Sequence, residues 1–292
     1  AAGLCLSALK KASDEQTVEL SPVKRSSPNK KAILVVSFGT SYAQTREKTI
    51  GAIEEDFRSA FPEYTIRRAF TSKMIIKKLR ERDGIEVDTV AQALEKLEAE
   101  GYSTVICQPT HVMGGFEFDD VKREVENWKG RFDHIACGWP LLTSSEDYEQ
   151  VTEALVQEFS DIPSNAALVL MGHGTEHPAN ATYPALDYRP KARGCKNFFV
   201  GTVEGYPDLQ TVMQEVAAIH ASKVFLAPLM VVAGDHAIND LCGEDEDSWK
   251  SCFEQAGYQT EPILKGLGEY PAFRRIYLEH CVQCIQSLES EQ

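Results

Sequence analysis

Positive charge is scarce in this chain. Its 292 residues include 30 Lys and Arg against 44 Asp and Glu, which gives a formal net charge of -14. Nucleic acids and anionic membrane surfaces require a basic binding face, so the balance argues against both as general partners. An anionic small molecule would have to meet a local basic patch.

Long apolar runs are also absent. The longest uncharged apolar run in the core spans residues 224–234 and is interrupted by Pro228. A helix that crosses a membrane needs about 20 apolar residues, so the sequence predicts no membrane span. Hydrophobic residues nevertheless make up 43% of the chain. That content is enough for one large core or for two cores of ordinary size.

The chain does not begin with methionine. Residues 1–9 carry no charge and are followed by Lys10 and Lys11, and the residues up to Lys31 are rich in Ser, Pro, Lys and Glu. This composition is typical of a linker, and we predict an extension and linker over residues 1–30. The pattern favours an export segment and a periplasmic location over a cytoplasmic one, although a cloning boundary would look the same.

Cysteines do not indicate the compartment. The eight cysteines are scattered along a chain that is too long to need disulfide staples. Cys281 and Cys284 form a Cys-x-x-Cys pair of the kind found in redox and metal sites. They also continue the helical spacing of Phe273, Ile276 and Tyr277. The spacing favours a buried helix face over redox or metal chemistry.

Predicted strands and helices alternate along the chain. Residues 32–38 form a continuous β-branched run of the kind found in strands that are buried on both faces. A helix with an apolar face follows and closes before Pro62. Further predicted strands, each separated from the next by a helical pattern, cover residues 64–70, 103–108, 134–137, 167–171, 197–202 and 224–232. The alternation predicts an α/β protein with parallel strands and helices on both faces.

The second half of the chain repeats features of the first. The strand over 167–171 ends in Gly172–Thr175, as the strand over 32–38 ends in Phe38-Gly39-Thr40, and Pro228–Gly234 matches Pro109–Gly115. We therefore predict two similar flavodoxin-like lobes, each a parallel sheet flanked by helices, with a ligand site in the cleft between them. The predicted lobes are residues 31–142 and 143–292. Convergent use of strand and turn patterns is the alternative to duplication.

A histidine between two glycines marks the end of the strand over 167–171. In open α/β sheets, ligands bind beyond the carboxyl ends of strands, and glycines there permit close approach. This position makes His173 the candidate centre of the chemistry. The same histidine would also serve to cap its own turn, and partners are needed to decide between the two interpretations.

Two other predicted strand ends of the second lobe supply such partners. Glu204 follows the strand over 197–202, and His236 follows the strand over 224–232. If the strands are parallel, both side chains converge on His173. Two imidazoles and one carboxylate suit cobalt, iron, nickel or zinc, and three protein ligands leave coordination positions open. The structural alternatives are that Glu204 caps the next helix and that His236 braces its glycine turn.

Several ordered motifs resemble one family. They are Ser-Phe-Gly-Thr-Ser (37–41), Ala-Phe-Thr-Ser-Lys-Met-Ile (69–75), Gln-Pro-Thr-His (108–111), Met-Gly-His-Gly-Thr-Glu-His (171–177), Gly-Thr-Val-Glu-Gly (201–205), Gly-Asp-His-Ala-Ile-Asn-Asp (234–240) and Asp-Glu-Asp-Ser-Trp-Lys (245–250). Together they resemble the anaerobic sirohydrochlorin cobaltochelatases, which are class II chelatases, over residues 31–288. The resemblance implies a lyase-type enzyme that inserts Co2+ into sirohydrochlorin without ATP on the route to cobalamin. The alternatives are the same reaction with Fe2+, which gives sirohaem, and a tetrapyrrole or metal carrier without catalysis.

The resemblance also implies roles for particular residues. The family's metal and catalytic set falls on His173, Glu204 and His236, with His173 as the base. His111 matches a family histidine in the first lobe and is expected to line the cleft. Apart from the resemblance, the strand-to-helix turn at Thr40 and Ser41 offers hydroxyl groups that are expected to bind substrate carboxylates. The candidate substrate-binding residues are therefore Thr40, Ser41 and His111.

The expected small-molecule partners are sirohydrochlorin and a divalent metal, with Co2+ bound as a substrate. No organic cofactor is expected. Some exported members of the family bind haem through a histidine in the helix after the loop of His111, but residues 116–130 contain no histidine, which argues against haem. A homo-oligomer is compatible with the sequence.

Overall fold

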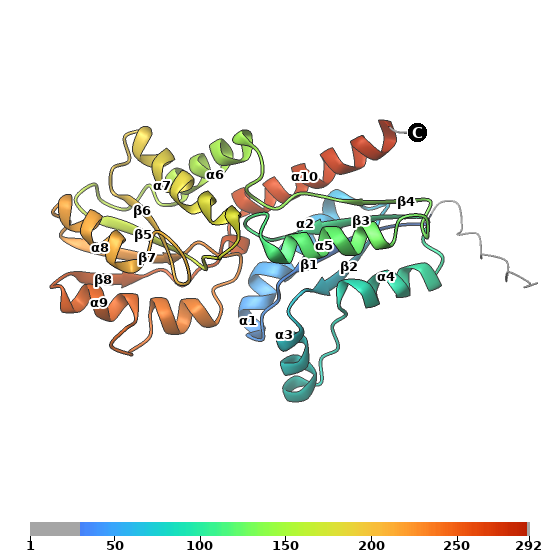
Figure 1. Ribbon diagram of the computed structural model, residues 1–292, viewed down its shortest axis with the longest axis horizontal. Helices are drawn as coiled ribbons and strands as arrows, with labels where there is room; N and C mark the ends of the chain where they lie inside the picture. Colours follow the sequence, from blue (N-terminus) through green and yellow to red (C-terminus); the bar gives the residue numbers. More distant parts are fainter. Residues whose placement is uncertain (1–29, 291–292) are drawn as a thin grey trace, which may run out of the picture.

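Two four-stranded parallel sheets form the centre of the computed structural model, which describes residues 30–290 (Figure 1). The first sheet has the order β2 (Thr65–Phe70), β1 (Lys31–Ser37), β3 (Thr104–Pro109) and β4 (His134–Cys137). The second has the order β6 (Phe198–Thr202), β5 (Ala167–Gly172), β7 (Lys223–Pro228) and β8 (Gln259–Pro262). The two orders are equivalent, so the prediction of two similar α/β lobes is confirmed.

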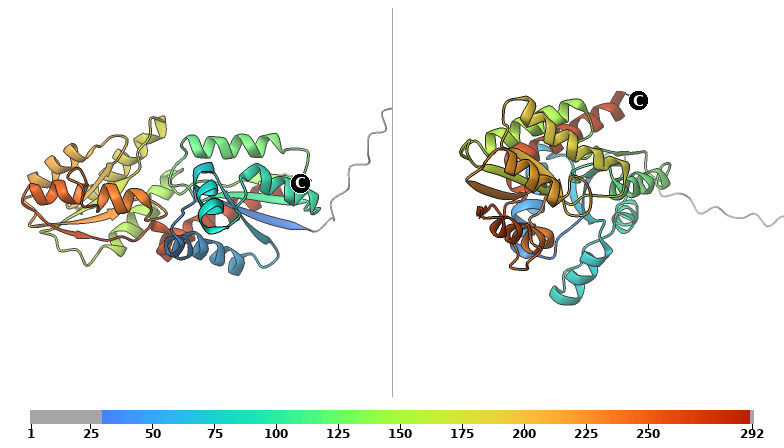
Figure 2. Two further views of the ribbon diagram at one scale, coloured as in Figure 1. Left: turned by 90° about the horizontal axis from the view of Figure 1, so that it is seen from below. Right: turned by 60° about the vertical axis from the view of Figure 1, so that its left-hand side comes forward.

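Helical segments connect the strands and cover both faces of each sheet (Figures 1 and 2). Those of the first half are α1 (Ala43–Arg46), η1 (Glu47–Gly51), α2 (Ala52–Ala60), α3 (Lys73–Lys78), η2 (Leu79–Asp83), α4 (Val90–Ala99) and α5 (Phe116–Asn127). Those of the second half are α6 (Ser145–Glu158), η3 (Pro178–Ala181), α7 (Thr182–Ala192), α8 (Leu209–Ala218), η4 (Ala237–Leu241), α9 (Trp249–Gln255), η5 (Leu267–Glu269) and α10 (Pro271–Ser290). In the described part of the chain, no helix combines the length and apolarity needed to cross a bilayer.

The apolar runs of the central strands explain the layers. In β1, Ile33 and Val35 face a core that includes side chains of α2 and α10, whereas Leu34 and Val36 face the core under α4 and α5. All four side chains are fully buried. Successive side chains of a strand point to opposite faces, so a strand covered by helices on both faces needs an uninterrupted apolar sequence.

One predicted strand is too long and one strand was not predicted. The prediction of a strand over 224–232 is wrong beyond β7, which ends at Pro228. Proline lacks a backbone N–H and cannot donate to a sheet ladder, so the chain leaves the sheet there. The edge strand β8 has mostly exposed side chains and therefore no apolar run to reveal it.

The last helix holds the two halves together. α10 follows the second sheet in sequence but packs against β3 and β4 of the first sheet and against α2 and α6. Its stripe of Phe273, Ile276 and Tyr277 is buried together with Cys281 and Cys284, so the interpretation of the Cys-x-x-Cys pair as a buried helix face is confirmed. The seven cysteines within the described residues are free thiols.

The predicted extension over residues 1–30 lies outside the described residues, apart from Lys30. The export segment and the periplasmic location therefore stay predictions. The lobe boundaries at 31–142 and 143–292 also stay predictions.

A buried contact between a histidine and a carboxylate fixes α10 against α6. His280 Nε2 lies 2.9 Å from Asp147 Oδ1, and His280 Nδ1 lies 3.2 Å from the carbonyl oxygen of Trp139. Both ring nitrogens face acceptors, so both contacts are hydrogen bonds when the ring carries two N–H groups. Burial raises the pKa of Asp147, but hydrogen bonds from His280 and from the Ser144 and Thr143 backbone outweigh it and lower that pKa below its ordinary value.

We predict that Asp147→Asn lowers the free energy of unfolding by roughly 1.5–3 kcal/mol at neutral pH, because the fold loses the buried carboxylate that accepts hydrogen bonds from the Thr143 and Ser144 backbone and contacts His280. A depressed folded-state pKa stabilises the fold above the unfolded pKa of about 3.9 and loses that effect as pH falls through the folded value. The difference from the parent protein should therefore persist at pH 5–7 and shrink below about pH 4. Urea denaturation at several pH values measures it.

Asp161→Asn, in an exposed turn after α6, is the matched control and should change the unfolding free energy by less than about 0.5 kcal/mol. A denaturation midpoint of Asp147→Asn equal to that of the parent would show that the pair does not stabilise the fold.

Candidate functional site

Three loops leave the carboxyl edge of the second sheet side by side. β5 pairs in parallel with both β6 and β7, so the segments after all three strands emerge at one edge. The pairing continues past the strands, because Val203 N–H donates to the carbonyl of Gly172 and Glu204 N–H donates to the carbonyl of His173 at 2.8 Å. Backbone hydrogen bonds therefore hold Glu204 beside His173.

The side chains from the three loops meet. The ring centroids of His173 and His236 are 4.6 Å apart with planes at 88°, and His173 Nδ1 lies 3.8 Å from Glu204 Oε2. All three side chains are accessible, with exposed fractions of 46% for His173, 61% for Glu204 and 36% for His236. The predicted convergence is thus present in the structure.

Side chains that lie close together do not by themselves form a metal site. Within residues 30–290, no group of three His, Cys, Asp or Glu side chains has the arrangement of a formed metal site. The assignment of His173, Glu204 and His236 as metal ligands therefore stays a prediction.

Hydrogen bonds at Nδ1 orient both imidazoles. His173 Nδ1 lies 2.9 Å from the carbonyl oxygen of Gly174, and His236 Nδ1 lies 2.7 Å from Asp240 Oδ2. A carbonyl and a carboxylate only accept, so each neutral ring carries its proton on Nδ1 and keeps the Nε2 lone pair free. A free Nε2 can bind a metal ion or take up a proton.

The two glycines around His173 are required by close contacts. A Cβ atom at Gly172 would lie 2.1 Å from the ring of Tyr183, and one at Gly174 would lie 2.6 Å from the backbone nitrogen of Gly205. Gly174 also has a φ of +85°, in the region that favours glycine. The Tyr183 hydroxyl accepts the N–H of Gly174 at 3.2 Å. The motif therefore positions the histidine between a packed ring and the loop of Glu204.

Three supporting residues were missed by sequence reasoning. Asn180 joins two loops of the site, since its Oδ1 accepts the N–H of Thr175 at 3.1 Å and its Nδ2 donates to the carbonyl of Tyr206 at 2.8 Å. No local pattern marks Asn180 or Tyr183. Asp240 carries a usable signal, because it lies four residues after His236 and therefore on the same side of a helical turn.

The first lobe repeats the turn without the histidine. Gly39, the counterpart of Gly174, has a φ of +103°, and Phe38 stands where the second lobe has His173. The Phe38 side chain is 45% exposed, which is unusual for a large aromatic residue at a strand end. Thr40 and Ser41 are only 3% and 2% exposed. The Thr40 hydroxyl accepts the N–H of Tyr42, so the contact of Thr40 and Ser41 with substrate stays a prediction.

His111 has an apolar environment. Both of its ring nitrogens are buried and have no hydrogen-bond partner among the described residues. Burial lowers the pKa of the His111 imidazole to about 4, so the ring is neutral at neutral pH. The His111 carbonyl accepts the N–H of Leu141. No hydrogen bond within residues 30–290 joins the ring to His173 or His236, and its predicted place in the cleft lining stays a prediction.

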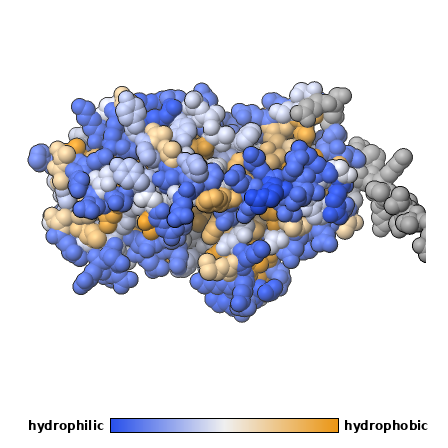
Figure 3. Space-filling model, viewed as in Figure 1, coloured by the Kyte–Doolittle hydropathy of each residue, from blue (hydrophilic) through white to orange (hydrophobic). Residues whose placement is uncertain are grey.

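The starts of two first-lobe helices, α1 and α5, contact residues close in sequence to His236 and His173. The Tyr42 hydroxyl donates to Asp235 Oδ1 at 2.7 Å, and Asp235 precedes His236 in the chain. At α5, His177 Nε2 lies 3.3 Å from Asp119 Oδ2, and its ring centroid lies 4.8 Å from that of Phe116. The site is therefore at the junction of the lobes, where apolar side chains are exposed between hydrophilic ones (Figure 3).

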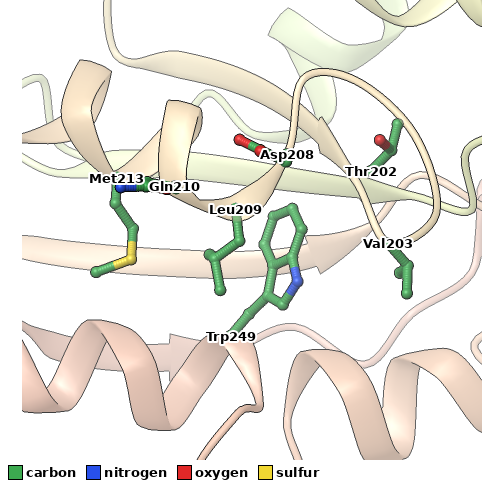
Figure 4. Close-up of a pocket in the computed structure, with 7 residues that line it drawn as sticks. All are labelled: Thr202, Val203, Asp208, Leu209, Gln210, Met213 and Trp249. Atoms are coloured by element: carbon green, nitrogen blue, oxygen red, sulfur yellow. The ribbon is translucent and has the colours of Figure 1, made fainter.

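A separate cavity of about 370 Å³ lies within the second lobe (Figure 4). Its lining residues are Thr202, Val203, Asp208, Leu209, Gln210, Met213 and Trp249. The Trp249 indole lies beside Leu209 in the close-up. None of these residues comes from the first lobe, and none belongs to the group of His173, Glu204 and His236.

Comparisons with known proteins agree with this geometry. Residues 31–286 match the family described as cobalt chelatase (CbiK). The chain is 45% identical over 262 residues to the sirohydrochlorin cobaltochelatase of Salmonella typhimurium, covering 90% of this chain and 99% of that protein. It is 34% identical over 273 residues to the sirohydrochlorin cobaltochelatase CbiKC of Nitratidesulfovibrio vulgaris, covering 92% and 96%.

Among solved structures, that of SirB from Bacillus subtilis with Fe3+ has a TM-score of 0.60 at 13% identity and covers 89% of this chain and 98% of that chain. This structural likeness shows the shared fold. The family match and the two relatives extend over nearly the whole chain and show more: the chain belongs to the cobalt chelatase (CbiK) family.

Proposed function

We propose that this chain inserts Co2+ into sirohydrochlorin without ATP, in the anaerobic synthesis of cobalamin. The observation that carries the proposal is the exposed group of two imidazoles and one carboxylate, in which each imidazole is held at Nδ1 by an oxygen acceptor. The names of the Salmonella and Nitratidesulfovibrio relatives support the choice of metal and of macrocycle. In this proposal, Co2+ is a substrate and no organic cofactor takes part.

The reaction requires the removal of two pyrrolic N–H protons while the metal ion loses water. An imidazole is suited to the first task, because a general base works best when its pKa lies near the working pH. His173 stands at the end of the central strand of the second sheet, with its Nδ1 held by the Gly174 carbonyl. Its Nε2, once it has released the metal ion, accepts the two pyrrolic protons one after the other and passes each to solvent, to which the side chain is 46% exposed.

Glu204 and His236 deliver the metal ion in this mechanism. The carboxylate of Glu204 is 61% exposed and the imidazole of His236 is oriented by Asp240, so both can reach a metal ion that arrives from solvent. Three protein ligands hold a divalent ion but leave positions for water and then for macrocycle nitrogens. Exchange of the protein ligands for four macrocycle nitrogens completes the transfer.

The same ligand set also fits Fe2+, because neighbouring first-row metals differ little in their preference for imidazole and carboxylate. Anaerobic mixing of the protein with sirohydrochlorin and Co2+ should convert the visible spectrum to that of the metallated product, at a rate proportional to protein concentration. Competition between Co2+ and Fe2+ ranks the metals. Faster turnover with Fe2+ would favour sirohaem synthesis, and a stoichiometric spectral change without turnover would favour a carrier.

We predict that His173→Ala lowers kcat by about 10²–10⁴-fold, because it removes the base. Circular dichroism should show an unchanged fold, since His173 is half-exposed. His220→Asn is the control: His220 is exposed after α8 and has a φ of 53°, which asparagine tolerates. Wild-type turnover in His173→Ala would remove His173 from the mechanism.

We predict that Asp240→Ala weakens Co2+ binding by about 10–100-fold, because His236 loses the acceptor that orients it. Asp240→Asn should retain most of the affinity, since its amide oxygen still accepts from Nδ1. Titration of the protein with Co2+, followed by the visible absorption of the bound ion, measures the difference. Asp161→Ala is the control, and equal affinities in Asp240→Ala and the parent would show that Asp240 has no part in binding.

A further inference from the structure

A basic segment projects from the acidic chain next to the site. Residues 73–83, which form α3 and η2, contain five Lys and Arg and two Asp and Glu, and we call this segment the basic arm. α3 extends away from the first sheet beside the junction of the lobes (Figures 1 and 2). Because the whole chain has a net charge of -14, this local excess of positive charge stands out.

Apolar contacts fix the root of the basic arm to the loop of His236. Ile75, Ile76 and Leu79 on one face of the arm pack in a cluster with Phe70. Val232, from the loop that carries His236, packs against the same cluster. The arm is therefore held at the junction of the lobes rather than projecting independently into solvent.

Hydrogen bonds also hold the basic arm at the junction of the lobes. Arg82 donates to the carbonyl of Ser41 at 2.5 Å, and the next residue, Tyr42, donates to Asp235, the neighbour of His236. At the start of the arm, Ser72 N–H donates to the carbonyl of Phe38 at 3.2 Å. The backbone at the start of α3 is thus tied to the backbone of Phe38, the first-lobe counterpart of His173.

The outer face of α3 combines apolar and cationic groups. Met74 is 72% exposed, and Lys78 lies one helical turn after it. Lys73 and Lys78 are exposed and form no salt bridge among the described residues, whereas Lys77 pairs with Glu81 and Arg82 pairs with Asp83. Lys78 is the i+4 neighbour of Met74, and Lys73 lies on the other side of Met74 on the outer half of the helix. An apolar side chain flanked by two ammonium groups matches the rim of a flat apolar ring that bears carboxylates.

The second lobe has no comparable basic surface near the loops that carry His173, Glu204 and His236. Glu204, Asp235 and Asp240 surround the two histidines, and the segment 244–247 is wholly acidic. These groups attract a divalent cation and repel a polycarboxylate. The divalent cation needs an acidic surface and the polycarboxylate needs a basic one, and the two surfaces therefore lie on different lobes.

We propose that the basic arm binds the carboxylates of the tetrapyrrole, with Lys73 and Lys78 as the pairing groups and Met74 in contact with the edge of the macrocycle. This inference rests on the proposed function and assigns the substrate-binding surface that it requires. The arm sets the affinity for the macrocycle and leaves the metal chemistry to the second lobe.

The test is the double variant Lys73→Glu/Lys78→Glu. It should raise the KM for sirohydrochlorin at least about tenfold at low salt, because two attractive charges become repulsive. The kcat and the KM for Co2+ should stay within about twofold, and the difference in KM should largely vanish at about 0.5 M NaCl through screening. Met74→Ala should raise the same KM by a smaller factor that does not depend on salt.

Lys129→Glu/Lys196→Glu is the matched control, with the same change of net charge. Both lysines are exposed and precede β4 and β6, at the opposite edge of each sheet from the site. An unchanged KM in the arm variant, or an equal rise in the control, overturns the inference while leaving the proposed function in place.

Spectroscopic titration of the metal-free protein with sirohydrochlorin separates the remaining outcomes. Weaker binding by the arm variant in a protein that does not metallate the macrocycle would support the arm and reject the proposed function. Equal binding by the parent and the arm variant, or no binding by the parent, would reject the arm.

Discussion

The parallel pairing of β5 with β6 and β7 is the constraint on which the site depends. Parallel strands end at one edge, so His173, Glu204 and His236 meet there although they are far apart in sequence. The pairing succeeds only because Gly172 and Gly174 let Tyr183 and the backbone around Gly205 approach closely. Each Nδ1 then finds an acceptor in its own loop. The chemistry of the free Nε2 atoms is therefore a consequence of backbone hydrogen bonding.

Two lobes with one topology carry different chemistry. Both sheets have equivalent strand orders and both have a glycine with positive φ after the central strand. The second lobe places an imidazole at this turn and surrounds it with carboxylates, whereas the first places the exposed ring of Phe38 there, next to the start of the basic arm. In the proposed mechanism, the second lobe binds the metal cation and the first lobe binds the polycarboxylate tetrapyrrole. α10 packs against elements of both lobes.

The sequence predicts most of this arrangement because local patterns encode it. Continuous apolar runs predicted the central strands, and polar residues at strand ends predicted the convergence on His173. The edge strand β8 has no apolar run, and Pro228 ends β7 where β-branched residues continue. The hydrogen bonds by which Asn180 joins two loops, and the packing of Tyr183, depend on contacts between distant segments. No local pattern could therefore reveal them. The docking of α10 on the first sheet is long-range for the same reason.

The central claim is that His173, Glu204 and His236 together bind the cobalt ion that is transferred. X-ray absorption at the cobalt edge of the protein loaded with one equivalent of Co2+ tests it most directly, because imidazole ligands give a distinct multiple-scattering signal. The account predicts two imidazoles and at least one oxygen ligand in the parent, and one imidazole after His236→Ala. A spectrum with oxygen ligands alone, or one that His236→Ala leaves unchanged, would contradict it.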